Sequence, residues 1–376
     1  MPEPFKNLFN RDLILTMSGL FDRLEGFDKG AFERIALAGL DDLEMMERSA
    51  QITGAMKAAI PGSMPDLLRP LSELLHPDLT DDISGGPSDA RGLRGWACVP
   101  VGNYVADTCL QYPEFALQFL AELTKRFSAE FAVRPFFRDH PDITIGKALE
   151  WTKDPNHHVR RLASEGSRPR FPWGIRLQDF VKDPAPILPI LAALKDDPSE
   201  YVRRSVANNL NDIAKDHPDI VNQIAAEWMQ DAPPNRRRLV KHACRSLIKS
   251  GNPDTLAIFG YGDVSAVRAD LAITPTSIRL GDQLQIDLEL AVNGSQDLTV
   301  LIDLVLGFRK ANGTLSSKVF KWTETTLNTN TALRLRKSLP IKPVTTRRHY
   351  TGKQSLSVQV NGVILATSDF ELIVPD

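Results

Sequence analysis

The chain has 376 residues, of which 42% are hydrophobic, and its 45 Lys and Arg nearly balance its 47 Asp and Glu. This length and apolar content predict two domains with buried cores, whereas the net charge of −2 does not decide for or against a nucleic-acid partner, because basic residues can gather on one face. No apolar run approaches the roughly 20 residues of a membrane span. The 3 cysteines are scattered without a CxxC pair, which argues against a disulfide framework or a zinc site. Since the N-terminus lacks a signal-peptide pattern, we expect a reduced, cytoplasmic protein without a metal or cofactor.

Helical periodicity dominates the first part of the chain. Residues 1–95 and 96–127 carry apolar side chains at helical spacing, and Pro113 separates two helices in the second segment. One expected core face consists of Phe115, Phe119, Leu120 and Leu123. The next helix is expected to start at residues 128–131, with Ser128 as its N-cap. Glu130 then lies in the first turn, where acids are favoured for purely structural reasons.

A repeated motif occupies the middle of the chain. Asp154-Pro155 is followed by Val159-Arg160-Arg161, and Asp197-Pro198 is followed by Val202-Arg203-Arg204. The offset of about 43 residues is the period of HEAT-type helical repeats. A weaker third copy places Val240-Lys241-His242 after Pro233-Pro234. We therefore predict an all-α HEAT-like solenoid.

The spacing within two copies of the repeat predicts which side chains share a surface. In the second copy one apolar stripe comprises Val202, Val206, Leu210 and Ile213, and the opposite stripe comprises Tyr201, Ser205, Asn208 and Asp212. In the first copy the packing face comprises Val159, Leu162, Ala163 and Gly166, and the side chains expected to point away are His158, Arg161 and Glu165. Stacked repeats would then present Glu165, Asn208 and Asp212 on one surface, of the kind that solenoids use for binding.

The segment between the two repeat helices is basic and aromatic. Residues 167–176 contain three Arg and Trp173, and two prolines restrict the backbone there. Arg matches phosphate geometry with two hydrogen bonds, and Trp offers a flat face to a base, a sugar or a cation. This segment is therefore expected to contact a ligand.

The hydrophobic period changes to that of strands from about residue 266. Alternating segments lie at 271–273, 284–288, 300–306, 319–322, 333–339, 356–360 and 370–374, and several are separated by the turn signals Asn293-Gly294, Asn312-Gly313 and Asn361-Gly362. Strands of this number and length predict a β-sandwich of immunoglobulin-like architecture. We therefore predict a helical domain over 1–262 and an all-β sandwich over 263–376.

Four blocks of the chain resemble the AlkC-type DNA glycosylases, in the order found in that family. They are SAEFAVRPF (128–136), VRRLASEGSRPRFPW (159–173), YVRRSVANNLNDIAKDHPD (201–219) and KHACRSLIKSG (241–251). Members of this family are alkylpurine glycosylases built on HEAT-like repeats, and one branch carries a C-terminal immunoglobulin-like domain. The resemblance implies base excision from double-stranded DNA that contains alkylated bases, by a protein that works as a monomer.

The resemblance also implies a catalytic set. Cleavage of an N-glycosidic bond builds positive charge on the deoxyribose, and a nearby carboxylate can stabilise this charge and orient the attacking water. Glu165 and Asp212 are the residues implied for this oxocarbenium stabilisation. Glu130 would complete the acidic pocket, and Trp173 would pack against the lesion nucleotide. A base that is already cationic leaves readily, so no strong general acid is required.

Glu165 and Trp173 also have purely structural explanations. Glu165 follows Arg161 at the spacing of an ordinary intrahelical ion pair, and Trp173 is compatible with a core position in a hinge loop. Asp212 lies late in its helix, where an acid opposes the helix dipole. That local conflict favours a functional role for Asp212.

Basic residues near the matched blocks are expected to bind phosphates and to give salt-sensitive, sequence-independent affinity. In the helical domain the expected DNA contacts are Arg134, Arg160, Arg161, Arg168, Arg170, Arg203, Arg204, Asn208, Lys241, Arg245 and Lys249. In the sandwich, Arg347 and Arg348 lie between two predicted strands, and the resemblance implies that this domain approaches the minor groove. The alternative for these residues is a solvated basic face with ion pairs, above all for Arg160 and Arg203.

Three hypotheses remain open at this point. The first is a monofunctional DNA glycosylase for cationic N-alkylated bases of the 3-methyladenine type. The second is a non-catalytic HEAT-repeat protein that binds DNA or acts as a scaffold. The third makes the sandwich a protein-interaction module attached to a helical scaffold.

Overall fold

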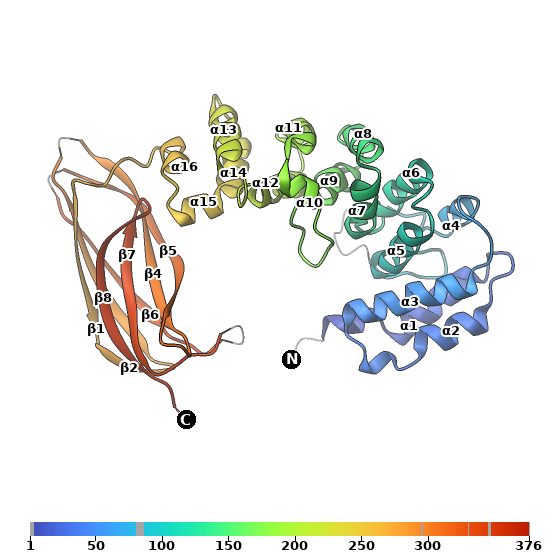
Figure 1. The fold of residues 1–376 in the computed structure, drawn as a ribbon, viewed down its shortest axis with the longest axis horizontal. Coiled ribbons are helices and arrows are strands. Elements are labelled where there is room, and N and C mark those ends of the chain that lie inside the picture. Colours follow the sequence, from blue (N-terminus) through green and yellow to red (C-terminus); the bar gives the residue numbers. More distant parts are fainter. Residues whose placement is uncertain (1–3, 80–85, 295, 330, 345–346, 376) are drawn as a thin grey trace. The chain divides into compact units, whose positions relative to one another are not determined.

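The computed structural model describes residues 4–79, 86–294, 296–329, 331–344 and 347–375. The chain packs into two compact units, the first formed by Met1–His217 with Ala232–Ala243 and the second by Pro218–Asp231 with Cys244–Asp376 (Figure 1). Within the described ranges, no helix combines the length and the apolar character needed to cross a membrane.

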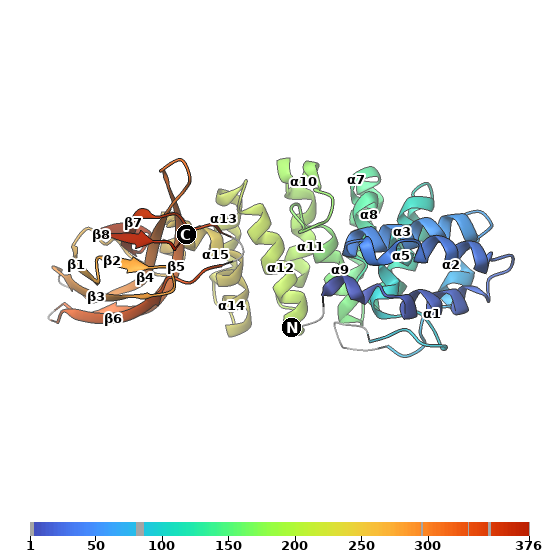
Figure 2. The same cartoon turned by 90° about the horizontal axis from the view of Figure 1, so that it is seen from below.

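The first unit consists of helices that follow one another as a stack (Figure 2). Its longer helices are α1 (Arg11–Phe21), α2 (Lys29–Leu37), α3 (Met45–Ala59), α4 (Leu68–Glu73), α5 (Cys98–Thr108), α6 (Pro113–Thr124), α7 (Glu130–Asp139), α8 (Pro141–Trp151), α9 (His157–Gly166), α10 (Gln178–Lys182), α11 (Leu188–Leu194), α12 (Glu200–Ile213) and α14 (Pro234–Ala243). Short 3-10 helices lie at Phe5–Leu8, Leu40–Asp42, Gly95–Ala97 and Ala185–Ile187. The predicted all-α repeat region is confirmed.

Two details of the helical predictions were wrong. Phe115 was expected on the core face of α6, but it is 57% exposed, whereas Phe119, Leu120 and Leu123 are buried. Ser128 was expected to cap α7, but the N-cap is Ala129 and no side chain caps this end. The Ser128 hydroxyl instead accepts a hydrogen bond from Arg161 Nη1 at 2.8 Å.

The repeat motif builds the same local structure twice, in α9 and α12. Arg160 Nη1 donates to the carbonyl oxygens of Asp154 and Pro155, at 2.9 and 3.0 Å. The equivalent Arg203 Nη1 donates to the carbonyl oxygens of Asp197 and Pro198, at 2.5 and 2.9 Å. One arginine of each motif therefore ties the helix to the Asp-Pro turn that precedes it.

The predicted apolar stripes of α9 and α12 are buried, but parts of the opposite faces are buried as well. Ser205 Oγ donates to Ser164 Oγ at 3.0 Å, and Asn209 Nδ2 donates to the Ser164 carbonyl at 2.8 Å. Glu165 and Asp212, expected on an open surface, are only 4% and 3% exposed. Single-helix periodicity missed this burial because neighbouring repeats cover both faces.

The second unit combines three helices with a β-sandwich. The helices are α13 (Pro218–Met229), α15 (Arg245–Ser250) and α16 (Pro253–Ile258). The strands are β1 (Val267–Thr274), β2 (Ser277–Arg279), β3 (Gln283–Val292), β4 (Leu298–Arg309), β5 (Leu315–Leu327), β6 (Leu333–Pro340), β7 (Gly352–Val360) and β8 (Val363–Ile373). The predicted boundary at 262/263 lies between the last helix and the first strand, although α13, α15 and α16 pack with the sandwich.

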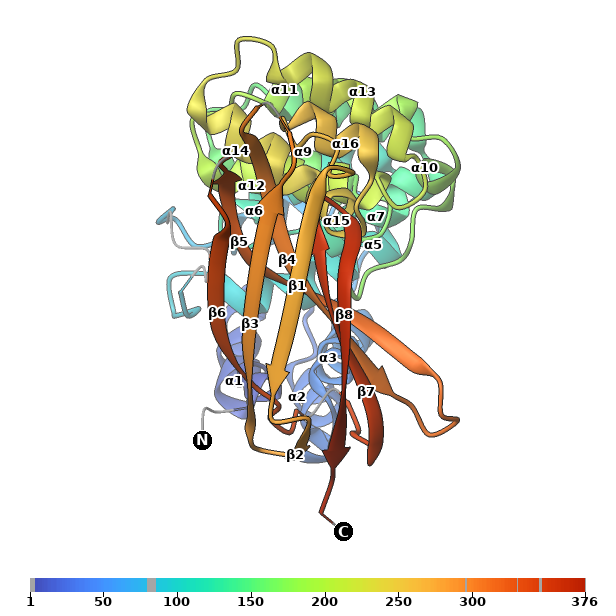
Figure 3. The ribbon, with the colours of Figure 1, turned by 90° about the vertical axis from the view of Figure 1, so that its left-hand side faces the viewer.

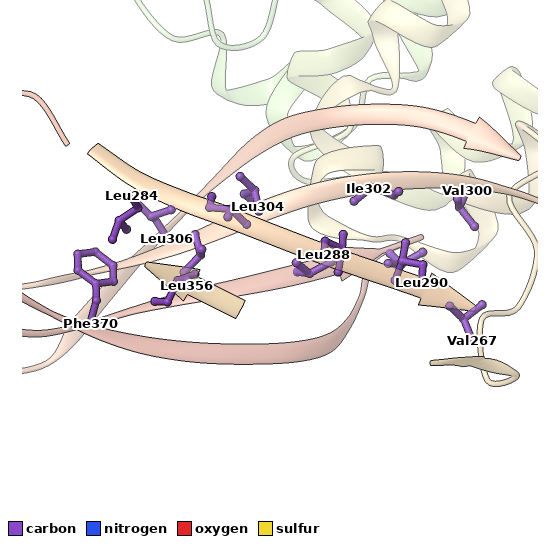
Figure 4. Close-up of a cluster of buried hydrophobic side chains, with 14 of the residues drawn as sticks. Val267, Leu284, Leu288, Leu290, Val300, Ile302, Leu304, Leu306, Leu356 and Phe370 are labelled. Carbon is purple, nitrogen blue, oxygen red and sulfur yellow. The ribbon is translucent and has the colours of Figure 1, made fainter. Parts of the chain in front are cut away.

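Two sheets enclose the core of the sandwich, with the strand orders β1-β3-β6 and β2-β8-β7-β4-β5 (Figure 3). Alternate side chains from both sheets meet in between, among them Leu288, Leu290, Ile302 and Leu304 (Figure 4). The predicted sandwich is confirmed, and the three-residue β2 is the strand that the sequence pattern missed.

Two glycines, Gly251 and Gly362, allow the end of α15 to approach the β7–β8 turn closely inside the second unit. Asn361 and Gly362 both have positive φ, 44° and 81°, as the Asn-Gly turn signal predicts. Gly251 ends α15 in the left-handed conformation. A Cβ added to Gly251 would lie 2.5 Å from Gly362 Cα, so the two backbones approach more closely than any side chain permits.

Candidate active site

Helices α7 and α9 approach closely and bring acidic side chains together. Gly166, at the end of α9, faces Val133 of α7, and a Cβ at Gly166 would lie 2.5 Å from Val133 Cγ2. This approach places Glu130, in the first turn of α7, beside the polar face of α9 that carries Arg161 and Glu165.

One arginine bridges the two carboxylates that the sequence singled out. Arg168 Nη1 donates to Glu165 Oε1 at 2.7 Å, and Arg168 Nε donates to Asp212 Oδ2 at 2.8 Å. Lys215 Nζ adds a contact of 2.9 Å to Asp212 Oδ1. Burial opposes the positive charge of Arg168, but Glu165 and Asp212 outweigh it and raise the pKa of Arg168. The structure therefore fixes both carboxylates with charge-assisted hydrogen bonds, which are stronger than neutral ones.

A second arginine joins the other end of the cluster. Arg161 Nη1 lies 3.6 Å from Glu130 Oε2, and Arg161 Nη2 lies 3.6 Å from Glu165 Oε1. The Arg161 guanidinium also lies 4.6 Å from the ring centroid of Tyr201, a cation–π contact. The intrahelical pair of Arg161 and Glu165 is thus present, but Glu165 makes its shorter bond to Arg168.

Glu130 is the least stabilised of the three acids. Its Oε2 is buried, and its 3.6 Å separation from Arg161 is too long for a hydrogen bond. Burial raises the pKa of Glu130, and the neighbouring Glu165 adds to this shift while Arg161 opposes it. An incompletely paired buried carboxylate costs stability, and such groups gather at functional sites.

Trp173 lies in the loop that joins α9 to α10, and Figure 1 shows this loop between the two helices. It is 88% exposed, so the alternative of a core position is wrong. Its φ of 60° is in the left-handed region, which is costly for a bulky residue. Because its side chain is exposed, packing does not explain the strained backbone of Trp173. Strain of this kind is concentrated at functional sites.

The structure divides the predicted DNA contacts into two groups. Several side chains in the helical unit have protein partners: Arg134, Arg160, Arg168 and Arg203 bond to carbonyl or carboxylate oxygens in the interior, and Arg170 pairs with Asp216 at 2.6 and 2.7 Å. Arg134, which is 0% exposed, cannot reach a phosphate in this conformation.

The second group lies at the surface. Arg204 is exposed beside Glu200, and Asn208 contacts His242 at 3.2 Å. Lys241 is half-buried, and Arg245 and Lys249 are exposed on the second unit. In the sandwich, Arg348 is exposed, and the Arg347 guanidinium stacks 3.7 Å from the ring centroid of Phe308.

Sequence reasoning missed several members of the cluster. The spacing of Lys215, three residues after Asp212, is a signal for an ion pair that could have been used. Tyr201 was assigned to the polar stripe without its contact to Arg161, and Ser128 was assigned to a helix cap. The bridging role of Arg168 had no local signal, because its partners come from two different helices.

Among the described residues, no group of His, Cys, Asp and Glu could hold a metal ion.

The comparisons with known proteins agree with this architecture. The family model described as "Uncharacterised protein YhaZ, C-terminal Ig-like domain" matches residues 267–374, and the model of the HEAT repeat matches residues 187–217. "Uncharacterized protein YhaZ" of Bacillus subtilis is 34% identical over 370 residues, which cover 98% of this chain and 99% of that protein. The structure of Pseudomonas fluorescens alkylpurine DNA glycosylase AlkC, bound to DNA containing an abasic site analog, is 34% identical with a TM-score of 0.88, over 99% of this chain and 100% of that one.

The fold and the site therefore define a HEAT-repeat protein with an immunoglobulin-like domain and a buried cluster of acids and arginines. The identity and coverage extend over nearly the whole chain. The chain belongs to the AlkC family of DNA glycosylases.

Proposed function

We propose that this protein is a monofunctional DNA glycosylase that hydrolyses the N-glycosidic bond of cationic, N-alkylated bases in duplex DNA. The observation that carries this proposal is the set of buried carboxylates of Glu130, Glu165 and Asp212, together with the exposed Trp173 in the loop that follows α9. The likeness to an alkylpurine DNA glycosylase over the full chain supports the same activity. A lesion of the 3-methyladenine type suits this proposal, because its base already carries a positive charge and leaves without help from a strong general acid.

In the proposed mechanism the carboxylates act on the sugar. As the base leaves, positive charge develops on the deoxyribose, and preorganised groups that meet developing charge are the most effective ones. Glu165 and Asp212 suit this task because Arg168 holds both in fixed orientations. One carboxylate would stabilise the oxocarbenium ion and the other would orient the attacking water. Glu130 would extend the negative potential, and Trp173 would pack against the lesion nucleotide.

The proposed grip on DNA is electrostatic. The exposed residues Arg204, Arg245, Lys249 and Arg348 are the phosphate contacts that the structure supports best. Arg347 is a further candidate in the sandwich, where its stacking on Phe308 fixes its orientation. Contacts of this kind give affinity that falls with salt and does not depend on sequence. Because one chain supplies all the proposed catalytic groups, we expect a monomer, acting on chromosomal DNA in the cytoplasm.

The scaffold alternative has weaker support. Carboxylates close to DNA repel its phosphates, so a protein that only bound DNA would gain by losing them. The three acids instead lie buried beside arginines, and the similarity to a glycosylase covers 99% of this chain. The alternative predicts salt-dependent DNA binding without release of any base.

Base release from methylated duplex DNA tests the proposal. We expect the purified protein to release 3-methyladenine, separated by chromatography, and we expect Glu165→Gln to abolish the release. DNA binding without any release by the wild type would favour the scaffold. Undiminished release by both Glu165→Gln and Asp212→Asn would overturn the site assignment and leave the activity standing.

The role of the sandwich requires a separate test. The double variant Arg347→Gln/Arg348→Gln should bind duplex DNA more weakly, with a salt dependence reduced by up to about two phosphate contacts. Unchanged affinity and salt dependence would favour the third hypothesis, in which the sandwich binds another protein.

A further inference from the structure

Arg134 holds both ends of the loop that carries Trp173. From α7, its Nη1 donates to the carbonyl oxygens of Gly166 and Arg168, at 3.0 and 2.8 Å. Its Nε donates to the carbonyl oxygen of Ile175 at 2.7 Å, and its Nη2 contacts the same oxygen. The bound carbonyls come from residues before and after Trp173, so a single guanidinium fixes the separation of the two arms of the loop.

The loop is shaped to lie against this side chain. A Cβ at Gly174 would lie 2.8 Å from Phe171 Cδ1 and 3.2 Å from Arg134 Cδ, so only glycine permits the approach. The Phe171 ring centroid lies 5.4 Å from the Arg134 guanidinium and 5.3 Å from that of Arg168. Beyond these contacts, the Leu177 amide donates to the Pro169 carbonyl at 3.1 Å and closes the base of the loop.

The conformation of Trp173 depends on this support. Its side chain is 88% exposed, so packing cannot hold its backbone at a φ of 60°. Residues in sparsely populated conformations persist only where the surroundings determine them. The surroundings here are the two arms of the loop and the arginine between them.

We infer that Arg134 is a positioning residue, which presents Trp173 to the DNA by fixing the two arms of its loop. The inference rests on the proposed function, and it replaces the expected phosphate contact of Arg134 with an internal role. The side chain is 0% exposed, and its donors are directed to protein oxygens. Burial lowers the pKa of Arg134 to about 10, with the neighbouring Arg168 adding to the shift. An apolar side chain would fill the same space without the cost of burying a charge, so the arginine is explained by its hydrogen bonds.

A double-mutant cycle separates positioning from simple structural support. Arg134→Lys keeps the charge but cannot bind three carbonyls in one plane. We expect it to lower kcat/KM for base release about 10- to 100-fold, since small misplacements of binding groups have effects of this size. In a Trp173→Ala background the same substitution should lower kcat/KM less than about threefold, because the effects of substitutions at residues that act through one another are not additive.

The chain offers a matched control and a second approach to the same contact. Arg48 is 3% exposed and donates to the carbonyl oxygens of Leu43, Lys6 and Phe9, at 3.1, 3.1 and 3.2 Å, far along the chain from the proposed site. Arg48→Lys should lower Tm and leave kcat/KM unchanged below the transition. Gly174→Ala disturbs the loop side of the contact without changing a helix core, and should reproduce the effect of Arg134→Lys.

Tryptic cleavage makes the inference independent of catalysis. Arg170 and Arg176 lie in the loop, and their cleavage should accelerate in Arg134→Lys and Gly174→Ala but not in Arg48→Lys. Absent base release by the wild type would refute the proposed function, while cleavage would still test the loop. Equal losses of kcat/KM with and without Trp173, or unchanged cleavage in both loop variants, would overturn the inference.

Discussion

Replacement of Arg168 should uncouple the two carboxylates at the centre of the site. Arg168→Gln removes the charge-assisted bonds of 2.7 Å to Glu165 and 2.8 Å to Asp212, and both acids are almost fully buried. Breaking a buried ion pair by removing one partner costs about 3–5 kcal/mol. Because whole proteins are stable by about 5–15 kcal/mol, we expect a large fall in the free energy of unfolding.

The conservative variant Arg168→Lys separates charge from geometry. An ammonium group keeps the positive charge but lacks the rigid fork that spans two carboxylates. Loss of one hydrogen bond to a charged group costs about 1.5–3 kcal/mol. If the lost bond orients a catalytic carboxylate, the same free energy corresponds to a fall of about 10- to 150-fold in kcat/KM.

Arg170→Gln is the control for these measurements. Arg170 lies two residues further along, but its pair with Asp216 is about a quarter exposed. Solvent-exposed pairs contribute about 0–1 kcal/mol, so this change should have little effect on stability. Denaturant unfolding and base release should be measured for all three variants. Wild-type stability and kcat/KM in Arg168→Gln would refute the bridging role.

Three further outcomes follow from buried groups. Glu130→Gln should raise stability at pH 7.5 and lower base release, because it removes a buried charge from the site; a fall in Tm would contradict this expectation. Burial raises the pKa of Asp303 to about 6, despite the opposing charges of Lys321 and Lys249. The folded state therefore holds this proton more tightly than the unfolded state, and stability decreases as pH rises from about 4 to 6; Asp303→Asn should raise Tm at pH 7.5, with the gain vanishing below about pH 4 in thermal scans. Gly251→Ala should cost more than about 2 kcal/mol, because its Cβ would lie 2.5 Å from Gly362 Cα at a φ of 75°; an unchanged melting curve would show that this contact is dispensable.

The sequence predicted the architecture because its signals are local and repeated. The motif at Val159 recurs at Val202, and each copy begins a helix after an Asp-Pro turn. Alternation and Asn-Gly turns predicted the strands equally well. The missed strand, β2, has three residues and pairs with β8 in parallel, and such a short segment carries no periodic signal.

The site was harder to predict, for physical reasons that Arg134 and Arg168 illustrate. Both were predicted to be phosphate contacts, because the sequence around an arginine near a basic loop does not reveal whether its side chain faces solvent or the interior. Their burial depends on α7, α9 and α12 packing together, which no single-helix pattern contains. Phe115 shows the converse, because helical spacing favoured the core while the fold leaves it exposed.

The central claim is that buried carboxylates of this protein act on the deoxyribose of an alkylated nucleotide. The most direct measurement is single-turnover release of 3-methyladenine from methylated duplex DNA by the wild type and Asp212→Asn, with DNA affinity measured at the same salt concentration. We predict release at least about 100-fold slower in Asp212→Asn, with affinity unchanged or tighter because a negative charge near phosphates is lost. Equally fast release by a variant that binds DNA normally would contradict the claim.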